Sequence, residues 1–139
     1  MGLDTSIFVY ALERLSPFAP VAEAVLRAVI DGHPTAAIST LVVAELLDVP
    51  YRARRPDLAS QYVQCLEAFP NLALVAPGVE VWRTAARLRA DAPALKLPDA
   101  IHLATAIEAG ATAFVTNDAR LAAAGALPIM LLSDLDTST

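Results

Sequence analysis

Short apolar runs alternate with longer segments of helical periodicity along almost the whole chain. Such alternation is typical of an α/β fold, in which parallel strands are joined by crossover helices. About five strands are expected, at residues 1–4, 36–38, 72–76, 113–116 and 129–132. The sequence therefore predicts an α/β fold, a single-domain α/β/α sandwich around a central, mainly parallel sheet.

Helices are expected in the segments between these strands, because apolar residues recur there every three or four positions. The expected helices cover residues 5–12, 21–31, 40–47, 57–68, a stretch after Gly78 that ends near residue 92, and 98–109, with a short helix at 119–124. Pro98 suits a first helical turn, and Gly110 suits a helix end. The segment between Pro50 and Pro56 is predicted to be a basic loop.

Length and composition fit one domain. The chain has 139 residues, of which 56% are hydrophobic, so it can bury a substantial core without disulfides or metals as staples. We expect a single domain to span residues 1–132. Residues 133–139 are expected to form a polar tail that frays.

The chain is expected to work in the cytoplasm. No apolar run approaches the ~20 residues of a membrane-spanning helix, and the first residues lack the pattern of a signal peptide. The single Cys65 cannot form an internal disulfide, which suits a reducing compartment. We expect its thiol to be buried and inert.

The formal net charge of −5 neither requires nor excludes a nucleic-acid substrate. Proteins that neutralise phosphates usually carry a basic stripe, and the only dense basic cluster here is Arg52, Arg54 and Arg55. This cluster could hold RNA phosphates, and a solvated loop explains it equally well. Part of the acidity could belong to carboxylates that bind metal.

Four acidic residues fall where α/β folds build their sites. Asp4 ends the first predicted strand and Asp118 follows the fourth, while Glu45 and Asp99 lie on predicted helices. In parallel sheets, sites form beyond the carboxyl ends of the strands, where the strand order reverses. Asp4 and Asp118 reach that edge directly. Glu45 and Asp99 reach it if their helices pack there.

Each acid also has a purely structural explanation. Asp118 can cap the helix that follows it, and Asp99 in a first helical turn complements the helix dipole. Glu45 is different because it lies in the otherwise apolar run 41–47. An unpaired carboxylate buried there is costly, so a cation or hydrogen-bond donors are expected beside it.

A site made only of carboxylate oxygens suits Mg²⁺ or Mn²⁺. Zinc favours His and Cys ligands, whereas the chain has two distant histidines and one cysteine. Clustered carboxylates that hold Mg²⁺ are suited to phosphodiester hydrolysis, since the metal activates water and neutralises charge on phosphate.

Four segments of the chain combine these acids with their neighbours: residues 3–6 (LDTS), 39–46 (STLVVAEL), 97–106 (LPDAIHLATA) and 113–118 (AFVTND). They resemble the motifs of the PIN-domain family, and within it those of the VapC ribonuclease toxins of toxin–antitoxin systems. Each segment alone is a weak signal. Their order, spacing and structural context make the resemblance specific, and together they extend over almost the whole chain.

The resemblance implies a Mg²⁺-dependent endoribonuclease with an acidic site, and Mn²⁺ as a possible substitute. By motif, Asp4 and Asp99 would be direct metal ligands. Glu45 and Asp118 would bind a second metal or hold waters of the first. The positions expected to support these acids are Thr5 or Ser6 for Asp4, and Thr116 and Asn117 for Asp118.

His102 follows Asp99 by one helical turn and shares its face of the helix. A packed structural role is favoured for this histidine, with a place near the site as the alternative.

The resemblance also implies a cognate antitoxin protein and a homodimer. The main alternative is a catalytically silent PIN-like module that binds protein or RNA. Two enzyme or signalling alternatives fit less well. A phosphatase with Asp4 as nucleophile would need a second aspartate where Ser6 stands, and a receiver domain would need its lysine elsewhere than Lys96.

The first strand is shorter than in many members of the resembled family. Only Met1, Gly2 and Leu3 precede Asp4. Since this strand is central in that fold, its shortness is expected to cost ladder hydrogen bonds and strand stability.

Overall fold

The computed structural model describes residues 1–135 and is built around one sheet. All neighbouring strands are parallel, in the order β3-β2-β1-β4-β5. The strands are β1 (Gly2–Leu3), β2 (Ala36–Ser39), β3 (Leu72–Val75), β4 (Phe114–Thr116) and β5 (Ile129–Leu131). The predicted α/β sandwich with a parallel sheet is confirmed.

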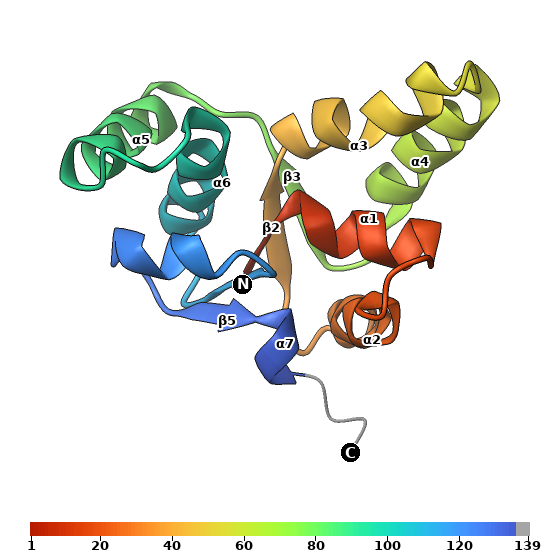
Figure 1. Ribbon diagram of the computed structural model, residues 1–139, viewed down its shortest axis with the longest axis horizontal. Coiled ribbons are helices and arrows are strands. Elements are labelled where there is room, and N and C mark those ends of the chain that lie inside the picture. Colours follow the sequence, from red (N-terminus) through yellow and green to blue (C-terminus); the bar gives the residue numbers. More distant parts are fainter. Residues whose placement is uncertain (136–139) are drawn as a thin grey trace.

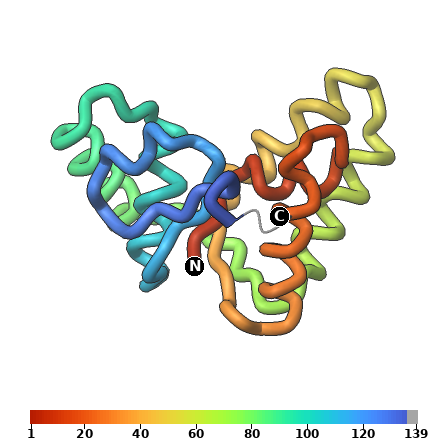
Figure 2. The backbone as a smooth tube through the Cα atoms, turned by 60° about the horizontal axis from the view of Figure 1, so that its bottom comes forward, coloured from red at the N-terminus to blue at the C-terminus, as the bar shows by residue number. Residues whose placement is uncertain are grey.

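Helices cover both faces of this sheet (Figure 1). One face carries α1 (Thr5–Glu13), α2 (Ala19–Ile30), α3 (Leu41–Arg52), α4 (Pro56–Ala68) and α7 (Leu132–Leu135). The other carries α5 (Val79–Asp91), α6 (Leu97–Glu108) and the 3₁₀ helix η1 (Ala119–Ala124). Figure 2 shows the two helical groups standing apart with the strands between them.

Each helical layer buries its own hydrophobic core against the sheet. Leu3, Ile7 and Val42 belong to the core under α1–α4, whereas Leu103 and Phe114 belong to the core under α5 and α6. All five side chains are at most 1% exposed. These two cores fix the helices that carry the acidic residues against opposite faces of the sheet.

The two-residue strand β1 is hydrogen-bonded on both sides despite its length. Gly2 N donates to Ala113 O at 2.8 Å, and Ala37 N donates to Met1 O at 2.9 Å. Asp4 N donates to Val115 O at 3.0 Å, which continues the ladder one residue beyond the strand. The short strand therefore keeps its pairing with both neighbours.

Gly2 is the position of β1 with the least space. A Cβ atom there would lie 2.5 Å from Ala106 Cβ and 2.7 Å from the Phe114 ring. We therefore expect Gly2→Ala to lower the free energy of unfolding by ~1–3 kcal/mol, the usual cost of overpacking. Urea denaturation measures it, with Gly78→Ala as control because a Cβ at Gly78 meets no atom within 4 Å. Equal stability of the two variants would contradict the tight contact between β1 and α6.

The basic loop predicted from Pro50 to Pro56 is wrong in its first half. Helix α3 continues through Pro50 to Arg52, and Pro50 is buried on it. The helix ends where Arg54 adopts a left-handed φ of 56° and Arg55 N donates to Pro50 O at 2.8 Å. Proline inside a helix removes one hydrogen-bond donor, yet α3 continues past the buried Pro50.

Two other expectations need correction. Residues 133–135, assigned to the polar tail, belong to helix α7 because Leu132 is fully buried and anchors it; the rest of that tail lies outside the described residues. The thiol of Cys65 is exposed on α4 and not buried. Among residues 1–135, no helix is long and apolar enough to cross a membrane.

Candidate functional site

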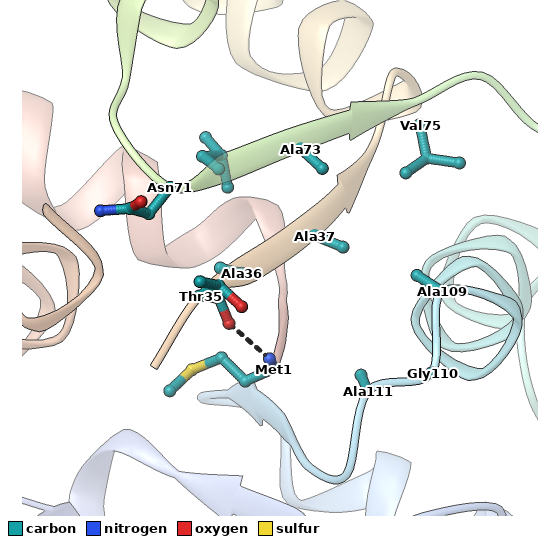
Figure 3. Close-up of a pocket in the computed structure, with 11 residues that line it drawn as sticks. Met1, Thr35, Ala36, Ala37, Asn71, Ala73, Val75, Ala109, Gly110 and Ala111 are labelled. Atoms are coloured by element: carbon teal, nitrogen blue, oxygen red, sulfur yellow. Dashed lines mark hydrogen bonds between the residues drawn. The ribbon is translucent and has the colours of Figure 1, made fainter. Parts of the chain in front are cut away.

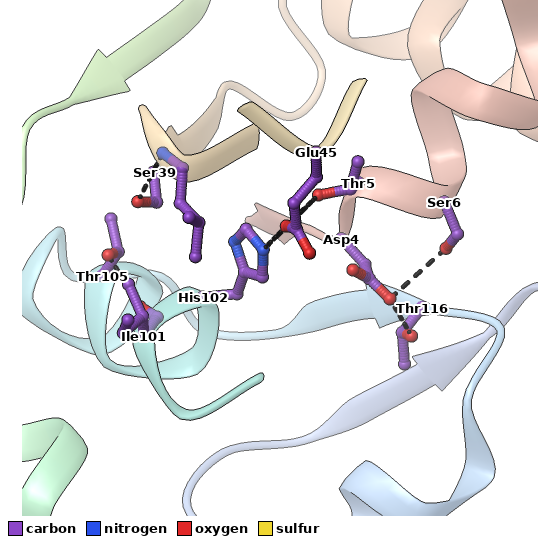
Figure 4. Close-up of polar contacts among 10 residues, drawn as sticks. Asp4, Thr5, Ser6, Ser39, Glu45, Ile101, His102, Thr105 and Thr116 are labelled. Carbon is purple, nitrogen blue, oxygen red and sulfur yellow. Dashed lines mark hydrogen bonds and ion pairs between the residues drawn. The ribbon is translucent and has the colours of Figure 1, made fainter. Parts of the chain in front are cut away.

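The strand order reverses between β1 and β4, and the acidic residues gather at the carboxyl edge of these two strands. Asp4 follows β1 and Asp118 follows β4. Helices α3 and α6 bring Glu45 and Asp99 to the same edge, where Glu45 lies beside Asp4 (Figure 4) and Asp99 lines one cavity with Asp118. An open cleft of about 390 Å³ beside Asp4 and Asp118 leaves the edge accessible to solvent.

Asp4 is held by hydroxyl groups on one of its two oxygens. Its Oδ2 accepts a hydrogen bond from Thr116 Oγ1 at 2.7 Å and one from Ser6 Oγ at 3.3 Å. Thr116 is fully buried on β4, and its Oγ1 also accepts from Asp118 N at 3.1 Å. A single buried threonine thus fixes Asp4 and the start of the Asp118 turn.

Glu45 is held in a similar way. Its Oε1 accepts from Thr5 Oγ1 at 2.8 Å and is also bonded to Nε2 of His102. Burial raises the pKa of Glu45, but the hydrogen bond and charge of His102, with the Thr5 hydroxyl, outweigh it and leave the pKa below its usual value. Glu45 is therefore a partly exposed carboxylate in a fixed orientation.

Both carboxylates keep a second oxygen without a protein partner. Neither Oδ1 of Asp4 nor Oε2 of Glu45 has a hydrogen bond within the part of the chain that the structure describes. Figure 4 shows these two oxygens turned toward one another. Fixed carboxylates with facing unpartnered oxygens repel each other unless a cation or water lies between them.

Asp99 lies in the first turn of α6 and lines one cavity with Asp118. It has no hydrogen bond or ion pair to another side chain in residues 1–135. Burial raises its pKa, and the charges of Asp4, Asp118 and Glu45 raise it further, against a smaller opposing effect of His102. The ionised form of Asp99 is therefore electrostatically disfavoured at this position.

Asp118 is bound mainly to Arg120. Its carboxylate accepts from Arg120 Nε at 2.9 Å and from Nη2 at 2.7 Å, and it caps η1 by accepting from Arg120 N at 3.0 Å. These hydrogen bonds lower the pKa of Asp118. The predicted structural role of Asp118 as a helix cap is confirmed.

The residues expected to support the acids have different partners. Of the two alternatives for Asp4, Ser6 donates to it, whereas Thr5 donates to Glu45 because the helical turn of α1 directs it toward α3. Asn117 donates to the hydroxyl of Tyr10 at 3.1 Å and not to Asp118. The bend after β4 directs its side chain toward α1, so of the two expected supports only Thr116 contacts Asp118.

The basic cluster lies away from the acids. Figure 1 shows the turn between α3 and α4 at the outer end of this helical pair, far from the strand ends. Arg52 is paired with Asp48 at 2.8 Å, and Arg55 is paired with Asp57 at 3.1 Å. Exposed pairs of this kind are weak, so the arginines, Arg54 included, remain available to other anions.

The contact between His102 and Glu45 is the feature that the sequence prediction undervalued. His102 is 3% exposed, which fits the favoured packed role, yet its ring also reaches Glu45 across the sheet edge (Figure 4). Its Nδ1 is buried without a hydrogen-bond partner in residues 1–135. The one-turn spacing from Asp99 was the available signal, since it directs both side chains to one edge.

The donor set fits a hard divalent cation by its chemistry. Carboxylate oxygens are the ligands that Mg²⁺ and Mn²⁺ prefer, and the unpartnered oxygens of Asp4 and Glu45 meet that need. Within residues 1–135, however, no three His, Cys, Asp or Glu side chains stand close enough to form a ready metal site. Glu45 is drawn to His102 and Asp118 to Arg120, so a cation would have to draw the acids together.

A parallel α/β sheet with acidic residues at its carboxyl edge defines the class of this protein, and comparison with known families narrows it. The model of the PIN domain matches residues 1–127. The chain therefore belongs to the PIN domain family. Members of this family are generally nucleases that depend on divalent metal ions.

Solved structures share the fold at low sequence identity. VapBC2 from Rickettsia felis, bound to a DNA fragment from its promoter, matches with a TM-score of 0.75 and 20% identity over 93% of this chain and 96% of that chain. A toxin–antitoxin complex from Klebsiella pneumoniae matches with a TM-score of 0.72 and 22% identity over 94% of this chain and 95% of that chain. FitAcB from Neisseria gonorrhoeae matches with a TM-score of 0.73 and 18% identity over 94% of this chain and 96% of that chain. No curated protein matches the sequence.

Proposed function

We propose that this protein is a metal-dependent endoribonuclease that hydrolyses RNA phosphodiester bonds with Mg²⁺ as its cofactor. The observation that carries the proposal is the pair of anchored carboxylates, Asp4 and Glu45, whose second oxygens face each other. Asp99 adds a third carboxylate whose ionisation is opposed by its neighbours. A divalent cation would relieve that repulsion and use those oxygens.

In this proposal Asp4 and Asp99 bind the metal directly, and Mn²⁺ can replace Mg²⁺. Glu45 and Asp118 bind a second metal or hold metal-bound waters. A bound divalent ion supplies a nucleophile by lowering the pKa of water and neutralises charge on the phosphate. The residues of the chain do the positioning: Thr116 and Ser6 fix Asp4, while Thr5 and His102 fix Glu45.

We further propose that the protein is a VapC-type toxin with a cognate antitoxin and that it forms a homodimer in the cytoplasm. The support is the family and the likeness of the fold to toxin–antitoxin assemblies from three bacteria. The exposed arginines at the turn between α3 and α4 (Arg52, Arg54 and Arg55) are candidates for contact with RNA phosphates.

A catalytically silent module that binds protein or RNA is the second candidate. It is favoured by one observation, namely that the described residues hold no ready group of three metal-binding side chains. In that case Arg120 and His102 would be permanent partners of Asp118 and Glu45. The acids would then serve structure and not chemistry.

One experiment separates the two candidates. Purified protein is incubated with a mixed RNA pool and Mg²⁺ or Mn²⁺, beside a sample with EDTA, and the products are mapped by sequencing. Discrete cleavage that EDTA abolishes is the expected result. RNA that stays intact with either metal, together with no heat of Mn²⁺ binding in calorimetry, would favour the silent module.

A further inference from the structure

A cavity of about 340 Å³ opens directly beside the acidic site. It lies between the segment that joins α5 to α6 and the 3₁₀ helix η1. Asp99 and Asp118 line its boundary with the site. The remaining wall is aliphatic apart from two cations, and consists of Ala92, Ala94, Leu95, Leu121, Ala123 and Ala124.

The two cations of the cavity are Lys96, the only lysine of the chain, and Arg120. Arg120 is paired with Asp118 at 2.7 Å, but its side chain is 75% exposed. Exposed pairs contribute only ~0–1 kcal/mol, so Arg120 can exchange this carboxylate for another anion at low cost. The cavity therefore combines an apolar interior with positive charge next to the acids.

A larger cavity elsewhere lacks this combination. It has a volume of about 490 Å³ and lies along the edge of the sheet at β2 and β3 (Figure 3). Its lining holds no acidic or basic side chain, and the terminal amine of Met1 is bound to Thr35 O at 2.7 Å. Size alone therefore does not identify a ligand site in this protein.

We propose that the cavity beside Asp99 and Asp118 receives the ribose and base of an RNA nucleotide adjacent to the scissile phosphate. The proposal rests on the proposed function, because it takes the acids as the place where the phosphodiester is cut. Lys96 and Arg120 then bind the phosphate groups on either side of that nucleotide.

The dimensions and chemistry of the cavity favour a nucleoside over a larger ligand. Its volume is at the lower end of the ~300–1,000 Å³ typical of small-molecule sites. Apolar walls suit the faces of a base, whereas no hydroxyl or amide side chain in the lining can read a base edge. The site therefore selects nucleotides by size more than by base identity.

Nuclear magnetic resonance tests binding without relying on catalysis. AMP, or inorganic phosphate alone, is added to ¹⁵N-labelled protein with Mg²⁺. We expect AMP to shift the amides of Leu95, Ala123 and Ala124, and phosphate to shift only those near Lys96 and Arg120. Ala123 is exposed and lines the cavity, so Ala123→Leu adds volume at the cavity wall and should abolish the AMP shifts.

Kinetics test the same variant on RNA. Ala123→Leu is expected to raise KM about 10-fold and to leave kcat nearly unchanged, because it removes binding that is equal in the ground and transition states. The matched control is Ala73→Leu, which fills the larger cavity on the edge strand β3. The control should show the KM of the wild type.

The outcomes separate this inference from the proposed function. Metal-dependent cleavage with an unchanged KM in Ala123→Leu, and no AMP shifts in the cavity, would overturn the nucleotide site and leave the nuclease intact. AMP shifts in a protein that cleaves no RNA would count against the nuclease and would overturn the place of this nucleotide beside a scissile phosphate. Both effects together support both proposals.

Discussion

Asp99→Asn is expected to abolish metal-dependent RNA cleavage and, at the same time, to stabilise the metal-free protein. The loss of activity should exceed the ~10–100-fold that follows removal of an outer partner of a metal ligand, because Asp99 is proposed to bind the metal itself. The gain in stability follows from the charge that the substitution removes from the repulsive cluster with Asp4, Asp118 and Glu45.

The gain in stability from Asp99→Asn should depend on pH in a defined direction. Burial and the neighbouring acids raise the pKa of Asp99 in the folded state. The wild type therefore loses stability relative to the variant as pH rises from about 3.9, the usual aspartate pKa, through the raised folded-state pKa. Below that range both side chains are neutral, and the difference should vanish.

Thermal unfolding in EDTA between pH 3 and pH 8 measures this difference. We expect the Tm of Asp99→Asn to exceed that of the wild type by a few degrees at pH 7, and excess Mn²⁺ to reverse the order by binding the folded wild type. Asp57→Asn is a suitable control, because its carboxylate on α4 pairs with Arg55 in solvent. Equal Tm values at pH 7 would show that Asp99 is not under electrostatic repulsion.

His102→Leu is expected to weaken Mn²⁺ binding by about 10–100-fold, the range for partners that orient a metal ligand. The substitution leaves Glu45 with Thr5 as its remaining donor, so the carboxylate is free to turn away from Asp4. His102→Gln should restore much of the affinity, because its amide nitrogen can occupy the position of Nε2. Isothermal calorimetry with Mn²⁺ measures all three proteins.

Thr105→Val is the control that distinguishes loss of packing on α6 from loss of the orientation that His102 gives to Glu45. Thr105 is fully buried on the same helix and donates only to Ile101 O of its own helix at 2.8 Å. Its replacement should cost stability without changing Mn²⁺ affinity. If His102→Leu lowers stability but binds Mn²⁺ as tightly as the wild type, His102 is a packing residue and the expected role is wrong.

The fold was predictable because its signals are local and repeated. Apolar runs such as 36–38 and 113–116, separated by helical segments, specify a parallel sheet whose crossovers have few alternatives. The boundary at Pro50 was not predictable, because burial of the proline on α3 depends on packing against the rest of the protein. The same holds for α7, where a single buried Leu132 decides the outcome.

The acidic site was predictable in position but not in detail. The strand ends place Asp4 and Asp118 at one edge from sequence alone, whereas Glu45 and Asp99 reach it because α3 and α6 pack there. Which donor holds which carboxylate depends on side-chain directions across three elements, so the bond of Thr5 to Glu45 could not be derived from spacing. The pairing of Glu45 with His102 joins residues 57 positions apart, and periodicity within one helix cannot reveal it.

The most direct test of the central claim is to locate the cation. Crystals soaked in Mn²⁺ are measured at the manganese absorption edge, and an anomalous difference map is calculated. We predict a peak between the carboxylates of Asp4 and Asp99, within reach of Glu45 Oε2. A map with no peak at the carboxyl edge of β1 and β4, at Mn²⁺ concentrations that support cleavage, would contradict the account.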